Sequence, residues 1–419
     1  MSRRGRAGAV RILALATILA GLAPAAARGQ EFAYRGFAEG TLTLYPQTVP
    51  RDTTRVVGDV LFRFDPSVEI SPGLSIAGSF DARADSHDET TIEGGVSFWD
   101  RTVERPALAV RRAVMTYARG PLTVELGKQF VRWGQTDILS PTDRFTPRDY
   151  LIVVSSDPVA VTAARVTLSK GSNSLGLVYL PRMTPSRLPI LTHRWAGLSA
   201  ASASVEILDT GSQFPGASQY GVRWNHAGRR LEWSASWFRG NNHLPLLDLI
   251  AVPQANAVAV KRRYPSMQSW GADLVAPLPW LAIKAEAGWF EPPDDDTDEY
   301  LLYVVQVERQ HRDWLFIGGY VGEWVKTDRD VLAFAPDRGL ARSLVARAGY
   351  TMGATRSLVL ETVVRQNGDG VYGKAEYSHG LGQHWRIAVR MLLITGDEAD
   401  FLGQYRRNSF AGSTVRYSF

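Results

Sequence analysis

The sequence predicts an all-β protein: a transmembrane up-and-down antiparallel β-barrel of about 18 strands, with about 16 as the runner-up count. Three observations lead to this prediction. Segments of about ten residues with alternating apolar and polar side chains run from residue 30 to the end of the chain. Tight turns and longer polar linkers alternate between these segments. The last segment ends on an aromatic residue, Phe419.

The first 29 residues have the features of a secretory signal peptide. Three arginines precede an apolar run from Ala7 to Ala23, and small residues follow it. A retained membrane anchor is the alternative, but the run is short and lacks a stop-transfer flank. We therefore assign 1–29 to the signal peptide and 30–419 to a single barrel domain in the cell outer membrane of a Gram-negative bacterium.

Charge and cysteine content exclude several classes of partner and site. The formal net charge is +5, and the predicted leader carries five arginines and no acidic residue, so the mature chain is close to neutral. A neutral chain lacks the main electrostatic basis for binding nucleic acid. The absence of cysteine excludes disulfides and thiolate metal sites. We predict no cofactor and no metal site.

The predicted strands have one apolar and one polar face. In one of them Val60, Phe62 and Phe64 alternate with mostly polar neighbours. After the leader, no segment has the long uncharged run that a membrane helix needs. The predicted strands are 32–45, 56–69, 73–83, 107–118, 121–131, 158–169, 174–183, 216–226, 230–239, 267–276, 280–290, 300–310, 313–324, 341–350, 357–366, 371–378, 384–395 and 407–419.

The connections favour a membrane barrel over a soluble sandwich. Short turns, such as Ser71-Pro72 and Arg119-Gly120, alternate with long polar linkers. A barrel inserted from one side has this arrangement, with short periplasmic turns and long extracellular loops. The long linkers are 46–55, 84–106, 132–157, 184–215, 240–266, 291–299, 325–340, 367–370 and 396–406.

The final strand adds a signal for membrane assembly. Ala411, Ser413, Val415 and Tyr417 share one face with the terminal Phe419. Bacterial outer-membrane barrels commonly end on such an aromatic residue, and Phe419 resembles their assembly signal. The expected partners are therefore the barrel-assembly machinery, outer-membrane lipid and lipopolysaccharide.

Charged side chains recur on the polar face of the strands, which must then line a lumen, because lipid would not accept them. For any single one, a bracing cross-strand ion pair is the simpler role. Lys128 and Arg111 fall on the apolar face, which predicts a bulge or a register error there. The candidate lumen residues are Arg63, Asp81, Arg165, Lys284, Glu286, Glu361, Arg365, Lys374, Glu376, Arg386, Arg390 and Arg416.

The third long linker, 132–157, is dense in Asp, Arg and Thr and contains two prolines. Inside a barrel such a loop would set the bore, whereas the alternative is an external cap. We expect it to fold inward as a constriction or plug. The candidate residues are Gln135, Asp137, Asp143, Arg144, Arg148 and Asp149.

The segment 127–151, GKQFVRWGQTDILSPTDRFTPRDYL, resembles the Gly-Lys-Gln, Trp-Gly and Ser-Pro-x-Asp run of a family of outer-membrane porins related to alginate-export channels. Segments 179–189 and 233–245 resemble the same family. The resemblance implies an 18-stranded substrate channel but names no substrate. In general porins, the third loop folds inward and narrows the pore.

These observations predict a porin-like channel for diffusion or selective passage of small polar or charged solutes. An export port or anchoring component for lipid or polysaccharide, working with periplasmic partners, is the alternative. An outer-membrane hydrolase is a remote one, because none of the seven histidines accompanies a nucleophile motif such as Gly-x-Ser-x-Gly. We therefore expect a protein that is not an enzyme.

Overall fold

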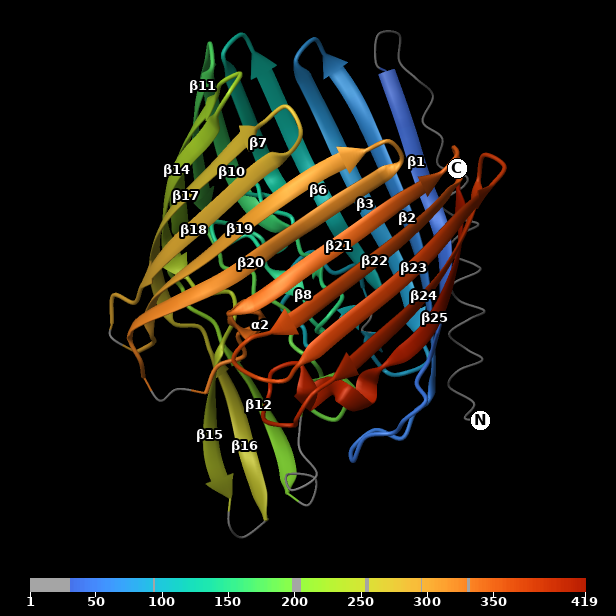
Figure 1. The fold of residues 1–419 in the computed structure, drawn as a ribbon. Coiled ribbons are helices and arrows are strands. Elements are labelled where there is room, and N and C mark those ends of the chain that lie inside the picture. The colour runs from blue at the N-terminus through green and yellow to red at the C-terminus, as the bar shows by residue number, and fades with distance from the viewer. Residues whose placement is uncertain (1–30, 93–94, 198–204, 253–255, 295, 330–331) are drawn as a thin grey trace.

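The computed structural model describes residues 31–92, 95–197, 205–252, 256–294, 296–329 and 332–419. Its main element is a closed sheet of 18 antiparallel strands, in which the first strand, β1 (Glu31–Leu44), pairs with both β2 (Val56–Ser71) and the last strand, β25 (Phe410–Ser418). This closed barrel confirms the predicted fold class (Figure 1). The signal peptide predicted over 1–29 lies outside the described residues. Within the described ranges, no helix has the length and apolar character needed to cross a membrane.

The remaining barrel strands follow in chain order, and each coincides with a predicted strand to within a few residues. They are β3 (Leu74–Asp85), β6 (Leu108–Arg119), β7 (Leu122–Gln129), β10 (Val161–Lys170), β11 (Asn173–Leu180), β13 (Gln219–Ala227), β14 (Glu232–Asn241), β17 (Ser266–Pro277), β18 (Ala282–Glu291), β19 (Glu299–His311), β20 (Trp314–Thr327), β21 (Ser343–Met352), β22 (Arg356–Arg365), β23 (Val371–Leu381) and β24 (Trp385–Thr395). Antiparallel pairing of each strand with the next gives the barrel no free edge.

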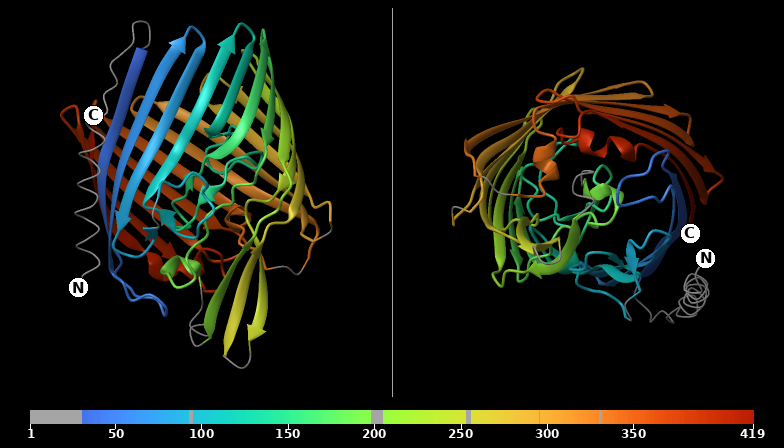
Figure 2. Two further views of the ribbon diagram at one scale, coloured as in Figure 1. Left: turned by 180° about the vertical axis from the view of Figure 1, so that it is seen from behind. Right: turned by 90° about the horizontal axis from the view of Figure 1, so that it is seen from below.

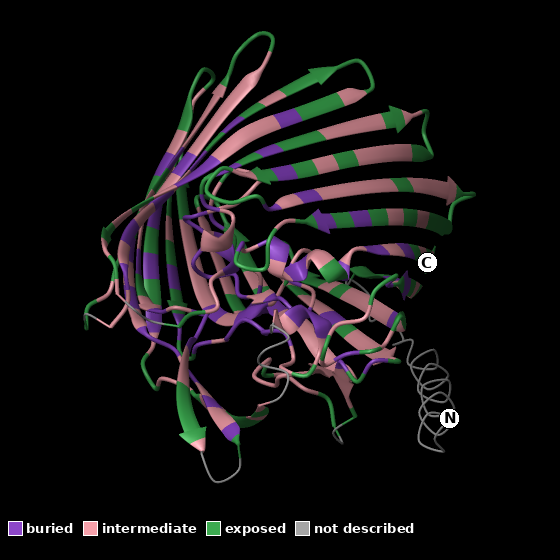
Figure 3. Ribbon diagram, turned by 60° about the horizontal axis from the view of Figure 1, so that its bottom comes forward, coloured by how far each residue is buried: buried purple, intermediate pink, exposed green. Residues whose placement is uncertain are grey.

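The outer surface of the barrel is apolar. On β24, Trp385, Ile387, Val389, Met391 and Leu393 are 37–59% exposed, whereas the residues between them turn toward the interior. Exposed and less exposed residues alternate in the same way along the other strands (Figure 3). A closed barrel with an apolar outer face and a charged inner face fits only a membrane, so the chain is an outer-membrane β-barrel.

Two basic residues predicted to face lipid, Arg111 and Lys128, instead turn inward, the first of them at a bulge. The pairing of β3 with β6 steps from Arg112 to Val110 and skips Arg111, which therefore borders the interior cavity that contains Arg63 and Asp81. Lys128 follows Gly127, whose φ is 120°, and it is only 2% exposed. Its ammonium donates to Asp100 at 2.6 Å. Neither side chain faces lipid.

Short turns join the strands at one end of the barrel, and long loops lie at the other end (Figure 1). Several loops fold back into the barrel, as the view along its axis shows (Figure 2). They carry the short pairs β4 (Thr90–Thr91) with β5 (Arg105–Pro106) and β8 (Arg148–Asp149) with β9 (Asp157–Pro158). They also carry two short 3-10 helices, η1 (Arg194–Ala196) and η4 (Gly403–Asn408), and the single-turn helix α2 (Pro336–Gly339).

A second sheet, which the sequence interpretation treated as irregular linker, projects from the long-loop end. It consists of β12 (Glu206–Gln213), β16 (Ala257–Arg263) and β15 (Leu246–Val252), in that order. It belongs to the two longest linkers, 184–215 and 240–266, and extends away from the barrel (Figure 1). None of the pairings found for these strands among the described residues joins them to a barrel strand, since the one outside the sheet is an isolated bridge from Leu246 to Ala333, so they extend the loops without changing the barrel's strand count.

Candidate constriction site in the barrel lumen

The third long loop, 132–157, lies inside the barrel and has its own aromatic core. Trp133 and Phe145 pack edge to face with ring centroids 4.8 Å apart, and Phe145 packs in turn on Phe238 of β14 at 5.0 Å. All three side chains are at most 7% exposed. Such a buried aromatic cluster holds the loop against the wall by apolar burial and ring packing.

Glycines on the inner wall make room for this loop. At Gly221 of β13, an added Cβ atom would lie 2.8 Å from Trp133 and 2.9 Å from Phe145. At Gly319 of β20 it would lie 2.5 Å from Ile138. These distances are shorter than a carbon contact permits, so any larger residue would push the loop away from the strand. The wall glycines that touch the loop in this way are Gly221, Gly271, Gly288 and Gly319.

Glu286 of β18 is the main polar anchor of the loop. Its carboxylate is buried, with the residue 2% exposed. One oxygen accepts from the backbone N–H groups of Gln135 (2.9 Å) and Thr136 (3.2 Å) and from the Thr136 hydroxyl (2.9 Å). The other accepts from the Ser140 hydroxyl (2.6 Å) and from the backbone N–H and hydroxyl of Thr142 (2.9 and 2.8 Å). The turn thus wraps around one buried negative charge with neutral donors.

The turn around Glu286 requires glycine at position 134. Gly134 has φ 98°, a left-handed conformation that other residues adopt only with strain. A Cβ atom there would lie 1.9 Å from the Ser140 hydroxyl and 2.5 Å from the Glu286 carboxylate. The Trp-Gly pair noted in the sequence therefore marks the point where the loop bends onto its anchor.

Asp137 forms a second contact with the wall at the edge of the open lumen. Its carboxylate accepts from Lys284 of β18 at 2.8 Å and from the Gln306 amide of β19 at 2.7 Å, while its backbone N–H donates to the Gln306 side chain at 3.0 Å. Burial alone would raise the pKa of the Asp137 carboxyl, but these donors outweigh it and lower the pKa. The Asp137 side chain is 45% exposed, so it borders solvent.

Asp149 is held in a different way, between two arginines of neighbouring loops. Its carboxylate accepts from Arg105 at 2.8 and 3.0 Å and from Arg187 at 2.7 Å, and the backbone N–H of Leu151 adds a fourth bond. Burial would raise the pKa of Asp149, but the two guanidinium groups outweigh it and hold the pKa well below its ordinary value. This cluster joins loop 132–157 to the linkers before and after it.

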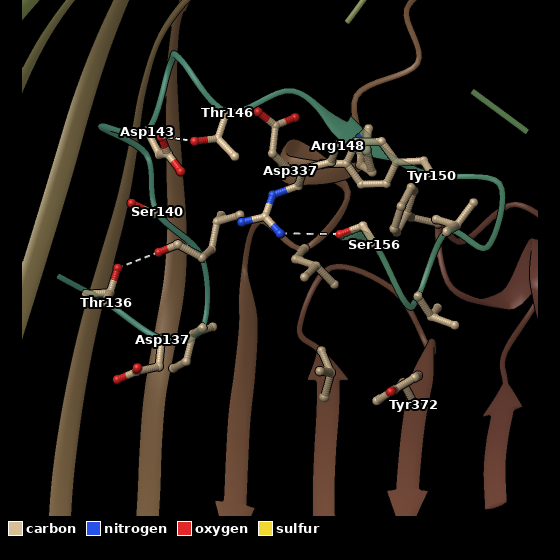
Figure 4. A pocket seen from close by; sticks show the side chains of 18 of the residues that line it. Thr136, Asp137, Ser140, Asp143, Thr146, Arg148, Tyr150, Ser156, Asp337 and Tyr372 are labelled. Atoms are coloured by element: carbon tan, nitrogen blue, oxygen red, sulfur yellow. Dashed lines mark hydrogen bonds between the residues drawn. The ribbon is translucent and has the colours of Figure 1, made fainter. Parts of the chain in front are cut away.

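A cavity of about 290 Å³ remains between the loop, α2 and the β22–β23 wall (Figure 4). The Arg148 guanidinium extends into it, and the only hydrogen bond found for that group among the described residues is a long one, 3.5 Å, to Ser156. The neighbouring Arg144 instead lies 3.7 Å from Asp337 and 4.8 Å from the Phe290 ring centroid. Of these two cations, Arg148 is therefore the one that reaches into the cavity without an acidic partner among the described residues.

Asp143 lies at the same cavity, but it is 7% exposed. Burial raises its pKa to about 6, although the Thr146 hydroxyl and the Trp133 N–H donate to it at 2.8 and 3.3 Å. Of the six candidate constriction residues, Asp143, Arg148 and Asp137 border the cavity with Arg144, whereas Asp149 lies in the arginine cluster. Gln135 contributes its backbone N–H rather than its side chain to the contact with Glu286.

Most of the candidate lumen residues lie in ion pairs, which join neighbouring strands except for Arg365 with Asp400 of a loop and Lys374 with Glu376 within β23. These pairs are Arg63 with Asp81 (2.6 Å), Arg165 with Glu125 (3.1 Å), Lys284 with Glu308 (2.9 Å), Arg365 with Asp400 (2.7 Å), Lys374 with Glu376 (3.6 Å) and Arg416 with Glu39 (2.6 Å). Arg390 stacks on Phe410 at 5.5 Å, Glu361 borders the cavity, and Arg386 lies beside Arg416 in register and is exposed. Paired charges of both signs brace the wall.

The structure brings one histidine to a serine, which bears on the hydrolase alternative. The Ser186 hydroxyl lies 2.8 Å from Nδ1 of His243, and both residues are buried. Burial, together with the positive charges of Arg144 and Arg148, holds the pKa of His243 well below its ordinary value. An imidazole beside two cations is a weak general base. Ser186 also accepts from the backbone N–H of Arg148 at 2.9 Å, so it links three loops.

Comparison with solved structures supports the same architecture. The chain is similar to a BenF-like porin from Pseudomonas fluorescens (TM-score 0.57, 10% identity, covering 94% of this chain and 98% of that one). It is also similar to OccAB4 of Acinetobacter baumannii (TM-score 0.58, 8% identity, covering 93% of this chain and 98% of that one). A third similar structure is OpdQ of Pseudomonas aeruginosa (TM-score 0.55, 9% identity, covering 94% of this chain and 99% of that one). No protein-family model matches the sequence, and no curated protein matches it. The chain has the fold of an 18-stranded outer-membrane porin.

Proposed function

We propose that the protein is an outer-membrane channel for small polar or charged solutes. The observation that carries the proposal is loop 132–157, which is fastened to the inner wall through Glu286 and leaves a polar cavity beside it. Eighteen strands enclose a lumen wide enough for water and solutes, and an inward loop narrows it to a selective passage. The proteins with similar folds include a BenF-like porin, which supports the same reading.

The size and chemistry of the cavity indicate the kind of solute. Its volume of about 290 Å³ is just below the range of small-molecule sites, which span roughly 300–1,000 Å³. The Arg148 guanidinium offers donors to a carboxylate or hydroxyl group, and Asp137 and Asp337 offer acceptors to an amine. Both signs of charge at one narrow place suit small charged or zwitterionic solutes better than apolar ones.

Liposome swelling tests this proposal. Vesicles that contain the folded barrel should swell in sugars, amino acids and aromatic acids below a size limit, and deletion of 134–150 should raise that limit. Single-channel conductance in planar bilayers should rise with the same deletion. A correctly folded barrel that neither conducts nor supports swelling, even after the deletion, would contradict the channel function.

The relation to alginate-export channels rests on the short motifs in 127–151, and it belongs to this proposal as its finer form. It would place the protein as an export port or anchor that works with periplasmic partners. Co-purification with a stoichiometric periplasmic or inner-membrane complex, combined with no swelling in small solutes, would favour this alternative over the diffusion channel.

Phe419 bears on the proposed assembly partner. Its backbone N–H and carbonyl each pair with Gly36 at 3.0 Å, and its ring stacks on Phe62 with centroids 6.1 Å apart. The terminal residue therefore lies at the seam where the last strand closes on the first. We propose that the barrel-assembly machinery binds this aromatic terminus before β25 pairs with β1. Phe419→Ala should then slow membrane insertion in pulse-chase experiments, whereas Ser418→Ala should not.

A further inference from the structure

Two histidines and a glutamate of different loops converge on the long-loop side of the barrel. His87 and Glu89 lie in linker 84–106, and His193 lies in linker 184–215 immediately before η1. One ligand atom from each of the three residues lies within 4.8 Å of the other two. The two imidazole rings have centroids 4.2 Å apart. His87 and Glu89 are each 8% exposed.

Neighbouring side chains orient this group in the manner of a metal site. Nε2 of His87 lies 2.9 Å from the Asp52 carboxylate, so the ring proton belongs on Nε2 and Nδ1, which faces Glu89 at 3.4 Å, keeps its lone pair. Oε2 of Glu89 accepts from Arg105 at 2.8 Å, which leaves Oε1, the oxygen nearer His87, for the cluster. A carboxylate behind a ligating histidine is the usual outer contact of protein-bound zinc.

The distance between His87 and Glu89 fits a metal site better than a close ion pair. A charged N–H to carboxylate bond is about 2.7–2.9 Å long, but Nδ1 of His87 is 3.4 Å from the nearer Glu89 oxygen. In a tetrahedral site with bonds of about 2.0–2.1 Å, two ligand atoms lie about 3.4 Å apart. A protonated His87 would also place a cation against the face of His193, whereas a metal ion would accept lone pairs from both rings.

From this geometry we propose that His87, Glu89 and His193 bind one divalent transition-metal ion of the zinc type. Nδ1 of His87, one oxygen of Glu89 and one ring nitrogen of His193 are the ligands, and water completes the shell. Two imidazoles and one carboxylate suit Zn²⁺, and they exclude the all-oxygen shell that Ca²⁺ and Mg²⁺ prefer. The ion would cross-link linker 184–215 to linker 84–106, and the contact of Asp52 with His87 would connect this metal site to linker 46–55.

Zinc binding by the folded, full-length barrel tests the proposal. The protein in detergent is stripped with a chelator and titrated with Zn²⁺ against a chromophoric competitor. The wild type should bind one equivalent, and Co²⁺ should give the visible absorption bands of imidazole coordination. His193→Ala should abolish both signals because it removes a ligand and leaves the His87–Asp52 contact intact. His311→Ala, an exposed histidine at the short-turn end, is the matched control.

Asp52→Asn gives a graded second test. Loss of the carboxylate behind His87 should weaken zinc binding roughly 10- to 100-fold without abolishing it. Heat-modifiable migration on gels verifies that each variant is folded. Wild-type protein that binds no Zn²⁺, or His193→Ala protein that binds it as tightly as the wild type, overturns the proposal. Because binding is measured directly, the result does not depend on channel function.

Discussion

Two buried carboxylates of the lumen, Glu286 and Asp149, are stabilised by opposite means. Glu286 accepts six hydrogen bonds from neutral backbone and hydroxyl donors of one turn. Asp149 lies between the guanidinium groups of Arg105 and Arg187, which come from other loops. Both are at most 6% exposed, so burial does not distinguish them. The difference lies in which groups offset the desolvation of the carboxylate: neutral donors for Glu286 and guanidinium groups for Asp149.

The comparison assigns the two anchors different tasks. The donors to Glu286 occupy fixed positions in a single turn, so this anchor specifies how loop 132–157 sits against the wall. The arginines of Asp149 are long, and they neutralise its charge in a cluster that joins several loops. We therefore expect Glu286 to control the bore and Asp149 to control the cohesion of the loops. Substitutions at the two sites should separate these effects.

Glu286→Ala should have the largest effect. It leaves the N–H groups of the turn unpaired in a buried place, at a cost of about 1–3 kcal/mol for each unsatisfied group. Loop 132–157 should then leave the wall, and single-channel conductance should approach that of the 134–150 deletion. Glu286→Gln should behave similarly, because its amide N–H₂ would face donors instead of accepting from them.

Glu376→Gln is the matched control for Glu286, since this lumen carboxylate pairs with Lys374 at 3.6 Å on a different part of the wall. It should leave conductance close to the wild-type level. Equal conductance of Glu286→Ala and the wild type would show that the aromatic cluster alone fixes the loop, and the contrast between the two anchors would then be lost.

Asp149→Asn should rank second. It leaves Arg105 and Arg187 without their shared carboxylate, a loss on the order of 3–5 kcal/mol for a buried charge cluster. Limited proteolysis should then cut the loops faster, while conductance changes less than in Glu286→Ala. The double variant Asp149→Asn with Arg187→Gln should lose less than the sum of the single variants, because the two residues interact. Asp328, an exposed acid of linker 325–340 outside this cluster, is the control, and its change to Asn should leave proteolysis unaltered.

Asp143 makes the attachment of loop 132–157 depend on pH in a range where the contribution of Asp149 does not change. Its pKa is raised by burial to about 6, above the ordinary value of 3.8, so the folded loop binds this proton more tightly than a detached loop does. The attachment is therefore strongest below about pH 4 and weakens as pH rises to about 6, by about 3 kcal/mol at most. The pKa of Asp149 is lowered instead, so its contribution stays constant above pH 4.

Current fluctuations from loop movement measure this pH effect. They should increase in the wild type between about pH 4 and about pH 7, and Asp143→Asn should hold them at the low level throughout, because asparagine still accepts from Thr146 without a charge. Fluctuations that follow pH equally in Asp143→Asn and in the wild type would assign the titration to another group.

The sequence was sufficient to predict the barrel because period-two alternation reports which face of each strand meets lipid. The alternation also places Glu286 and Lys284 on the inner face, together with Gln306 and Gly288, whose contacts with the loop no local pattern reveals. Glycines on the inner face of a strand can indicate that another segment packs against the strand there, because glycine in a strand interior often marks a close approach of another part of the chain.

The contacts between loops could not be predicted from the sequence, and the reason is physical. Arg105, Arg187 and Asp337 lie in linkers without periodicity, and their partners are separated from them by tens or hundreds of residues. No local rule specifies which charges meet when several loops fold into one lumen. Strand β12 was missed similarly, because its pairing with β16 joins two different linkers, whereas β15 and β16 pair within one linker.

The smallest effect should come from Arg148, and it tests whether pairing decides which arginines a solute encounters. Arg105 and Arg187 share Asp149, whereas Arg148 reaches into the cavity with a single long bond to Ser156. Arg148→Glu should therefore shift the reversal potential in a salt gradient toward cation preference while the conductance changes little. Arg119→Glu makes the same change in net charge at a short turn outside the lumen, and it should not shift the potential. An equal shift in both variants would mean that selectivity follows overall charge, and the distinction between paired and unpaired arginines would then carry no functional weight.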